Sequence, residues 1–104
     1  MGAPDVVISD QPEVHRFEAR RRGELVGFLD YRWVGHRRVL LHTEVPPAFE
    51  GQGIGSALAR HVLDLARSGE ERVSIKCPYL RTFIERHPEY TPDDLGRIPQ
   101  REGG

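Results

Sequence analysis

The sequence predicts a single α/β (α+β) domain in which a mixed, mostly antiparallel sheet packs against one long and one short helix. The length of 104 residues fits one ordinary domain. The first half of the chain alternates apolar and polar residues with the period of strands, and the second half changes to helical spacing after a pair of prolines. Apolar residues make up 38% and charged residues 30% of the chain, which is a globular rather than a disordered composition.

Three consecutive antiparallel strands, joined as a meander, are expected in the first half. They span residues 14–20, 25–33 and 39–45, and a further short edge strand is expected at residues 6–9. Pro46 and Pro47 end the third strand, because proline cannot donate a hydrogen bond to a sheet ladder.

Alternation along each strand assigns side chains to its two faces. In the first strand, His15, Phe17 and Ala19 are expected on one face and Arg16 and Glu18 on the other. In the second strand one face is expected to carry Leu25, Leu29, Tyr31 and Trp33, and the opposite face Val26 and Phe28.

The helical half begins after the prolines. Apolar side chains and one histidine recur at helical spacing at Ile54, Leu58, His61, Val62, Leu65 and Ala66. Ser68 and Gly69 are a typical helix end. An extended segment at residues 72–77 and a short helix at 79–86 follow, and the segment is expected to lie beside the third strand through a crossover.

One domain is therefore expected over residues 1–90. Leu80, Phe83 and Ile84 of the short helix are expected to be buried in it. Residues 91–104 are polar and are expected to form a C-terminal tail with little to bury.

Charge and cysteine content narrow the class of partner. The net charge of -1 gives no overall field for nucleic acid or for anionic lipid. The single cysteine, Cys77, cannot form an internal disulfide, and its surroundings have no zinc-ligand spacing, so we expect no metal. No apolar stretch is long enough to span a membrane, and we expect a cytoplasmic protein.

Three glycines alternate where the long helix begins, at Gly51, Gly53 and Gly55. Backbone N–H groups can converge there without Cβ obstruction, and the helix dipole adds positive potential, so the segment suits an anion. It matches neither the phosphate-binding loop, which needs Gly-Lys-Ser/Thr, nor the dinucleotide fingerprint, whose third glycine comes later. Taken alone, the glycines are equally well explained as a flexible loop before a helix.

Four short motifs occur in order along residues 14–90: His42 to Val45, Gly51 to Gly55, Cys77-Pro78, and Pro88 to Tyr90. With them the chain resembles the GNAT superfamily of acyl-CoA-dependent N-acetyltransferases, and within it the small single-domain YjdJ-like type. The superfamily signature is (Arg/Gln)-x-x-Gly-x-(Gly/Ala), and Glu50 stands here in place of its Arg or Gln. The backbone contacts of the signature do not depend on that side chain.

The resemblance implies a binding site for acetyl-CoA or coenzyme A (CoA). It places the CoA pyrophosphate on the loop amides, at Gly51, Gln52, Gly53, Ile54, Gly55 and Ser56. It also implies that the pantetheine arm pairs with the third predicted strand at Glu44 and Val45. Phe83 and Arg86 are candidates for contact with the adenine and the ribose phosphate, with core packing and surface ion pairing as equal alternatives.

Amine acetylation needs a group that takes a proton from an ammonium and a donor to the departing thiolate. Glu44 is the candidate base, and His42, two residues earlier on the same face, is the candidate to orient it. The alternatives are a solvated carboxylate and a packed strand histidine. Cys77 either carries the acetyl group, lines the pocket beside the thioester, or is an inert buried thiol, and Tyr79 is a candidate general acid.

The sequence thus predicts an acetyl-CoA-dependent N-acetyltransferase acting by direct, base-assisted attack of an amine. The acceptor is left open between a protein or peptide amine and a small amine. The alternatives are a CoA-binding module with little or no catalysis, and a small adaptor whose exposed strand edge pairs with another protein.

Overall fold

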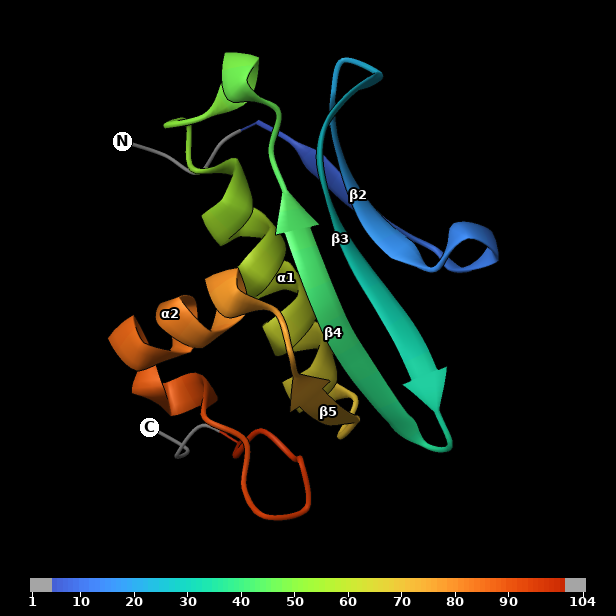
Figure 1. Ribbon diagram of the computed structural model, residues 1–104, viewed down its shortest axis with the longest axis vertical. Coiled ribbons are helices and arrows are strands. Elements are labelled where there is room, and N and C mark those ends of the chain that lie inside the picture. The colour runs from blue at the N-terminus through green and yellow to red at the C-terminus, as the bar shows by residue number, and fades with distance from the viewer. Residues whose placement is uncertain (1–4, 101–104) are drawn as a thin grey trace.

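The computed structural model describes residues 5–100 as a five-stranded sheet whose helices lie on one face (Figure 1). The strands follow chain order across the sheet: β1 (Val7–Gln11), β2 (Arg16–Arg21), β3 (Glu24–Val34), β4 (Arg37–Glu44) and β5 (Arg72–Ile75). Strands β1 to β4 are antiparallel, and β5 runs parallel to β4. The helices are α1 (Ile54–Ser68) and α2 (Pro78–Arg86). Single 3-10 turns occupy Pro12–Val14, Pro47–Phe49 and Pro88–Tyr90.

The predicted fold class is confirmed. The meander, the edge strand at the N-terminal side and the parallel last strand beside β4 are all present. Helix α1 provides the crossover between β4 and β5 and ends at Gly69, whose N–H donates to the carbonyl of Leu65 over 2.9 Å. The parallel pair needs such a crossover because two adjacent parallel strands cannot be joined by a tight turn.

A single core lies between the sheet and the helices. From the sheet it takes Phe17, Ala19, Val26, Leu29, Tyr31, Leu40 and Val73. From α2 it takes Leu80, Phe83 and Ile84, as predicted. From α1 it takes Ile54, Leu58, Val62 and Ala66 of the predicted stripe, together with Ala59 and Leu63. His61 and Leu65 of the predicted stripe are exposed instead, because they lie at the edge of the buried face. The apolar stripe of α1 therefore faces the strands, and α2 closes the same core beside β4 and β5.

Two β-bulges correct the predicted faces of the strands. Ala19 pairs with Gly27 and Arg20 with Leu25, which leaves Val26 as the extra residue in β3. The prediction that Val26 lies opposite Leu29 is wrong, because the bulge turns Val26 into the core, where it is fully buried.

The second bulge lies in β4. Asp30 pairs with His42 and Tyr31 with Leu40, so that Leu41 is the extra residue. Leu40 enters the core, whereas His42 and Glu44, beyond the bulge, lie on the other face of the sheet. His15 also departs from its predicted face: it ends the turn Pro12–Val14 with a φ of 58°, and it precedes β2.

The segment after Thr91 packs against the sheet more than its composition indicates. Ile98 is 4% exposed, and the backbone of Arg97 forms an isolated antiparallel β-bridge with that of Arg72 at the free edge of β5. The N–H of Val73 donates to the carbonyl of Gly96 over 2.8 Å. The two segments are so close here that a Cβ on residue 96 would lie 2.8 Å from the carbonyl oxygen of Val73. The expectation of little to bury is wrong for Ile98; the last residues of the predicted tail, 101–104, lie outside the described range.

A buried polar cluster joins β1, β3 and β4. Arg38, 5% exposed, pairs with Glu71 through two hydrogen bonds of 2.9 and 3.1 Å, and its guanidinium lies 4.6 Å from the ring centroid of Tyr31. The Tyr31 hydroxyl donates to Asp10 over 2.6 Å. Burial, followed by this hydrogen bond, raises the pKa of Tyr31 to about 12.

The raised pKa predicts a loss of stability in alkali. An unfolded tyrosine loses its proton near pH 10.0, whereas Tyr31 in the folded chain keeps it to about pH 12. Its contribution to the free energy of unfolding is therefore complete below pH 10 and is lost as the pH rises toward 12. Tyr31→Phe should lower this free energy by about 1 kcal/mol at pH 7. Between pH 10 and 12 the free energy of unfolding of the variant, measured in urea, should fall less than that of the wild type. Parallel curves for the two proteins would contradict the assignment.

Candidate active site

A cleft of about 660 Å³ opens where β4 ends and α1 begins. The end of β4 and the start of α1 lie side by side in the upper half of Figure 1. Its walls come from the end of β4, the glycine-rich loop, the first turn of α1 and the first turn of α2. The lining residues are Thr43, Glu44, Val45, Phe49, Glu50, Gly51, Gly53, Ile54, Gly55, Ser56 and Tyr79. The cleft thus brings together the third predicted strand and the glycine loop, which the family resemblance places at one site.

The cleft exists because β4 and β5 separate. Their pairing ends at Leu40 and Ile75, although β4 continues to Glu44. The N–H groups of Lys76 and Cys77 both donate to the carbonyl of Leu40, over 2.9 and 3.0 Å, and the chain then turns away into α2. The last residues of β4 therefore border the cleft along an edge without a neighbouring strand from β5.

The first turn of α1 forms the opposite wall. Gly53 precedes the helix in the left-handed region with a φ of 80° and provides no side-chain cap. The first backbone bond of the helix runs from the Ala57 N–H to the Gly53 carbonyl over 3.0 Å. The N–H groups of Ile54, Gly55 and Ser56 precede that bond, so they have no acceptor within the helix. Together with the dipole of a 15-residue helix, they make this wall favourable for an anion.

Tyr79 lies directly against this turn. A Cβ on Gly55 would come within 2.8 Å of the Tyr79 hydroxyl oxygen, so only glycine allows the ring its present position. The Tyr79 hydroxyl lies 3.3 Å from Ser56 Oγ, and its residue is 41% exposed. The structure therefore brings Tyr79 into the cleft, beside the predicted cofactor loop.

His42 and Glu44 form a pair beside the cleft, which Glu44 lines. His42 Nε2 lies 3.1 Å from Glu44 Oε1, and both side chains are more than half exposed. The ring of His42 faces that of Phe28 with 6.4 Å between centroids. Glu44 also lines the cleft, so its carboxylate connects the cleft with the face of the sheet that the helices leave open.

Cys77 does not line the cleft. It is 1% exposed, and its Sγ lies 3.3 Å from Oγ1 of Thr43, which does line the cleft. Of the alternatives left open for this thiol, a buried position behind Thr43 agrees best with the geometry.

This position predicts slow alkylation of Cys77. Iodoacetamide should modify the native protein far more slowly than the urea-unfolded chain, because the thiol is reached only when the fold opens. Saturating CoA should change the rate little beyond its effect on global stability, which urea unfolding with and without CoA measures. Strong protection by CoA with stability held constant would instead place the thiol against the ligand.

Three predicted cofactor residues have side chains outside the cleft. Gln52 Oε1 accepts a hydrogen bond of 2.7 Å from Arg21, which ties the glycine loop to the β2–β3 hairpin. Phe83 is 6% exposed and packs on His87 at 4.3 Å between ring centroids, so the core-packing alternative holds for it. Arg86 also lies outside the lining of the cleft.

Thr43 and Phe49 line the cleft but were not among the predicted site residues. Thr43 stands between His42 and Glu44, so strand alternation places it on the face opposite to theirs, but only the bulge at Leu41 turns that face toward the helices. Phe49 lies in the short turn Pro47–Phe49, where no periodicity predicts its direction.

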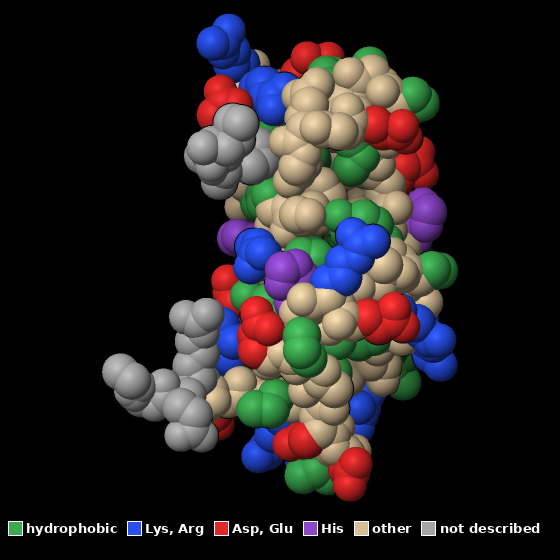
Figure 2. Space-filling view, turned by 90° about the vertical axis from the view of Figure 1, so that its left-hand side faces the viewer, with side chains coloured by type: hydrophobic (Ala, Val, Ile, Leu, Met, Phe, Trp, Pro, Cys, Tyr) green, Lys and Arg blue, Asp and Glu red, His purple; other side chains and the backbone are tan. Residues whose placement is uncertain are grey.

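The described residues offer little support for a metal site, a membrane span or a basic binding patch. Within residues 5–100 no group of three or more His, Cys, Asp or Glu is placed to hold a metal ion. Over the same range no helix is long and apolar enough to cross a membrane. Figure 2 shows Lys and Arg side chains mixed with Asp and Glu over the face that it presents, rather than gathered in one basic patch.

Curated relatives match most of the chain. Bovine Protein NATD1 is 41% identical over 69 residues, which cover 65% of this chain and 59% of that protein. Human Protein NATD1 is 37% identical over 69 residues, with the same two shares. The matched region therefore spans about three fifths of the length of these relatives.

Solved structures share the fold. A GCN5-like protein from Staphylococcus aureus superposes with a TM-score of 0.63 at 20% identity, covering 96% of each chain. Ribosomal-protein-alanine N-acetyltransferase from Brucella melitensis superposes with a TM-score of 0.57 at 22% identity, covering 84% of this chain and 70% of that one. The model of the GCN5-related N-acetyl-transferase family matches residues 16–95. The chain therefore belongs to the GCN5-related N-acetyltransferase family.

Proposed function

We propose that this protein binds acetyl-CoA in the cleft and transfers the acetyl group to an amine. One observation carries the proposal. A single cleft is lined both by the first turn of α1, whose N–H groups lack helical acceptors, and by Glu44, which is paired with His42. The first suits a pyrophosphate, and the second suits the removal of a proton from an ammonium.

The residues present fit CoA. Gly51 and Gly53 both have a φ of 80°, so the loop adopts a backbone that exposes N–H groups and that side chains disfavour. The cleft volume of about 660 Å³ lies within the range of small-molecule sites. Because Glu50 also lines the cleft and carries a negative charge, the backbone N–H groups, and not a side chain at position 50, hold the pyrophosphate.

Each polar residue of the cleft has a role in the transfer. Acetyl-CoA, when bound, supplies an acetyl group whose bond to sulfur breaks as its bond to the amine nitrogen forms. Glu44 takes the proton that the ammonium must lose, directly or through water, since its carboxylate is accessible. His42 orients that carboxylate through the 3.1 Å contact. Tyr79 gives a proton to the departing sulfur and regains one from solvent.

Thermal melts with CoA and an acetylation assay with a panel of primary amines test the proposal. We expect CoA to raise the melting temperature, and amines to accelerate thiol release from acetyl-CoA, with acetylated amine detected by mass spectrometry. A CoA effect without any amine-dependent release would favour a CoA-binding module. The absence of both effects at millimolar CoA would rule out the cofactor assignment.

A further inference from the structure

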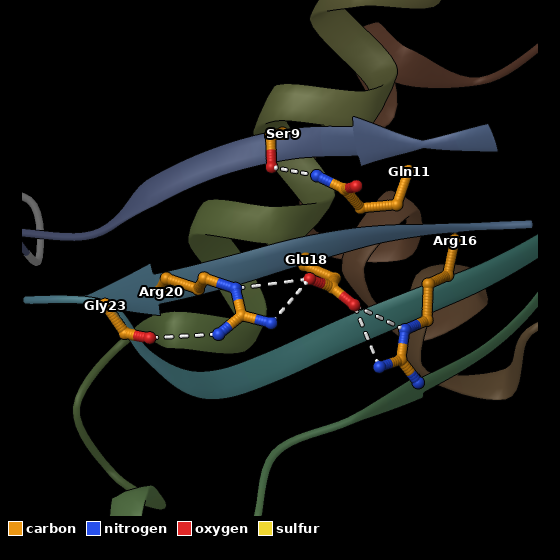
Figure 3. Close-up of polar contacts among 6 residues, drawn as sticks. All are labelled: Ser9, Gln11, Arg16, Glu18, Arg20 and Gly23. Atoms are coloured by element: carbon orange, nitrogen blue, oxygen red, sulfur yellow. Dashed lines mark hydrogen bonds and ion pairs between the residues drawn. The ribbon is translucent and has the colours of Figure 1, made fainter. Parts of the chain in front are cut away.

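The face of the sheet opposite α1 and α2 carries polar side chains in regular register. We call it the open face and define it by Ser9, Gln11, Arg16, Glu18, Arg20, Phe28, Asp30, His42 and Glu44, which pair across the strands. Figure 3 shows its β1 and β2 members in front of the strands, with both helices behind. This face meets the cleft at Glu44, so an acceptor crossing it reaches the proposed base.

Arg16 and Arg20 on this face are already committed to Glu18. Arg16 lies 2.8 Å and Arg20 3.0 Å from the Glu18 carboxylate, which is itself nearly buried (Figure 3). Burial raises the pKa of Glu18, but the two guanidinium groups outweigh it and hold that pKa below the usual value. The three side chains therefore form an ion-paired unit with a net charge of about +1.

Asp30 is a carboxylate of the open face that lies outside this ion-paired unit. It pairs in register with Arg16 on one side and with His42 on the other. The guanidinium of Arg16 nevertheless turns to Glu18 and lies 4.6 Å from the ring centroid of Phe28. Over residues 5–100 no hydrogen bond or ion pair involves the half-buried carboxylate of Asp30.

The strand register fixes the distance between Asp30 and Glu44 across β3 and β4. Phe28 is opposite Glu44 and Asp30 is opposite His42, so Asp30 and Glu44 are diagonal neighbours on one face. Diagonal neighbours of an antiparallel pair lie roughly 7–8 Å apart, and their Cβ atoms are somewhat closer. This distance is close to that between the two nitrogens of an extended short-chain diamine.

We infer that Asp30 binds the acceptor, and that the preferred acceptors are small linear diamines and polyamines. The inference rests on the proposed function: one amine lies at Glu44 and loses its proton, while the second, still protonated, pairs with Asp30. A monoamine reaches Glu44 without the second contact. The open face has no enclosing wall from the helices, so charge rather than shape selects the acceptor.

Steady-state kinetics with 1,5-diaminopentane and pentylamine test the inference. The wild type should favour the diamine in kcat/KM by about two- to fivefold, the range of an exposed ion pair. Asp30→Asn should raise KM for the diamine by that factor, leave its kcat nearly unchanged and leave pentylamine unaffected. Asp94→Asn, an exposed carboxylate in the segment after α2, is the matched control and should keep the preference. Added salt should reduce the wild-type preference.

A binding measurement separates this inference from the proposed function. In an NMR titration of the CoA-saturated protein, 1,5-diaminopentane should shift the resonances of Phe28 and His42 with about two- to fivefold higher affinity than in Asp30→Asn. An unchanged rise in melting temperature with CoA shows that the variant still folds and binds the cofactor. Equal diamine affinity in the two proteins would overturn the role of Asp30, whether or not any amine is acetylated.

Discussion

Replacing Glu44 by glutamine is expected to lower kcat about 100-fold or more while the CoA-induced rise in melting temperature stays the same. The amide has nearly the shape of the carboxylate and keeps the contact with His42, which lies 3.1 Å away. It cannot take a proton from the ammonium, and proton transfer to a positioned base contributes roughly 100- to 10,000-fold to such reactions. Because the base acts in the transition state, kcat and kcat/KM should fall together.

Glu50→Gln is the matched control for this variant. Glu50 lines the same cleft and loses the same charge, but it lies on the loop beside the anion wall rather than at the rim with His42. Its turnover should stay within a few-fold of the wild type, and CoA binding should tighten, since a negative charge near the pyrophosphate is removed. Equal turnover in Glu44→Gln across pH 6 to 9 would exclude Glu44 as the base and leave water as the acceptor of the proton.

The sequence predicted the fold well because each element has its own periodic signal. The stripe of α1 recurs at helical spacing, and the helix turns Leu58 and Val62 into the core. The hairpin between β2 and β3 agrees with Arg22 and Gly23, both of which have positive φ in the structure. Such local agreement between pattern and conformation is what makes an element predictable before its neighbours are known.

The faces of the strands were less predictable, because a bulge shifts the alternation without a clear sequence signal. Val26 and Leu41 each add one residue to their strand, and the side chains beyond that residue change faces. The relation between His42 and Glu44 survived because both lie beyond the bulge, and two residues of one strand still share a face. Their position on the open face, away from the core, depends on the bulge.

The site was predictable where backbone dictates it and less so where side chains do. The glycine loop forms a wall of the cleft, and Gly51 and Gly53 both have positive φ there. Glycine is the residue that adopts this backbone conformation most readily, so the glycines in the sequence already mark the loop. Phe83 shows the opposite case: its helix was predicted correctly, but its ring packs on His87 within the core. Spacing along one helix cannot tell a core contact from a ligand contact when both lie on the apolar stripe.

Gly53→Ala is expected to remove most of the CoA-induced stabilisation, which at a ligand concentration of 100 times Kd is about 2.7 kcal/mol for a binding-competent protein. Gly53 lines the cleft and precedes α1 with a φ of 80°, so an alanine there strains the backbone whose N–H groups face the proposed pyrophosphate. Thermal melts over a range of CoA concentrations measure the loss.

The left-handed conformation alone costs an alanine about 1 kcal/mol, and that cost must be separated from the effect on binding. Gly23→Ala provides the separation, because Gly23 has a φ of 83° in the β2–β3 turn, away from the cleft, and a Cβ there meets no other atom within 4 Å. Both variants should therefore lose similar stability without CoA, and only Gly53→Ala should lose the response to it. If Gly53→Ala responds to CoA as strongly as Gly23→Ala does, the first turn of α1 is not where the pyrophosphate binds.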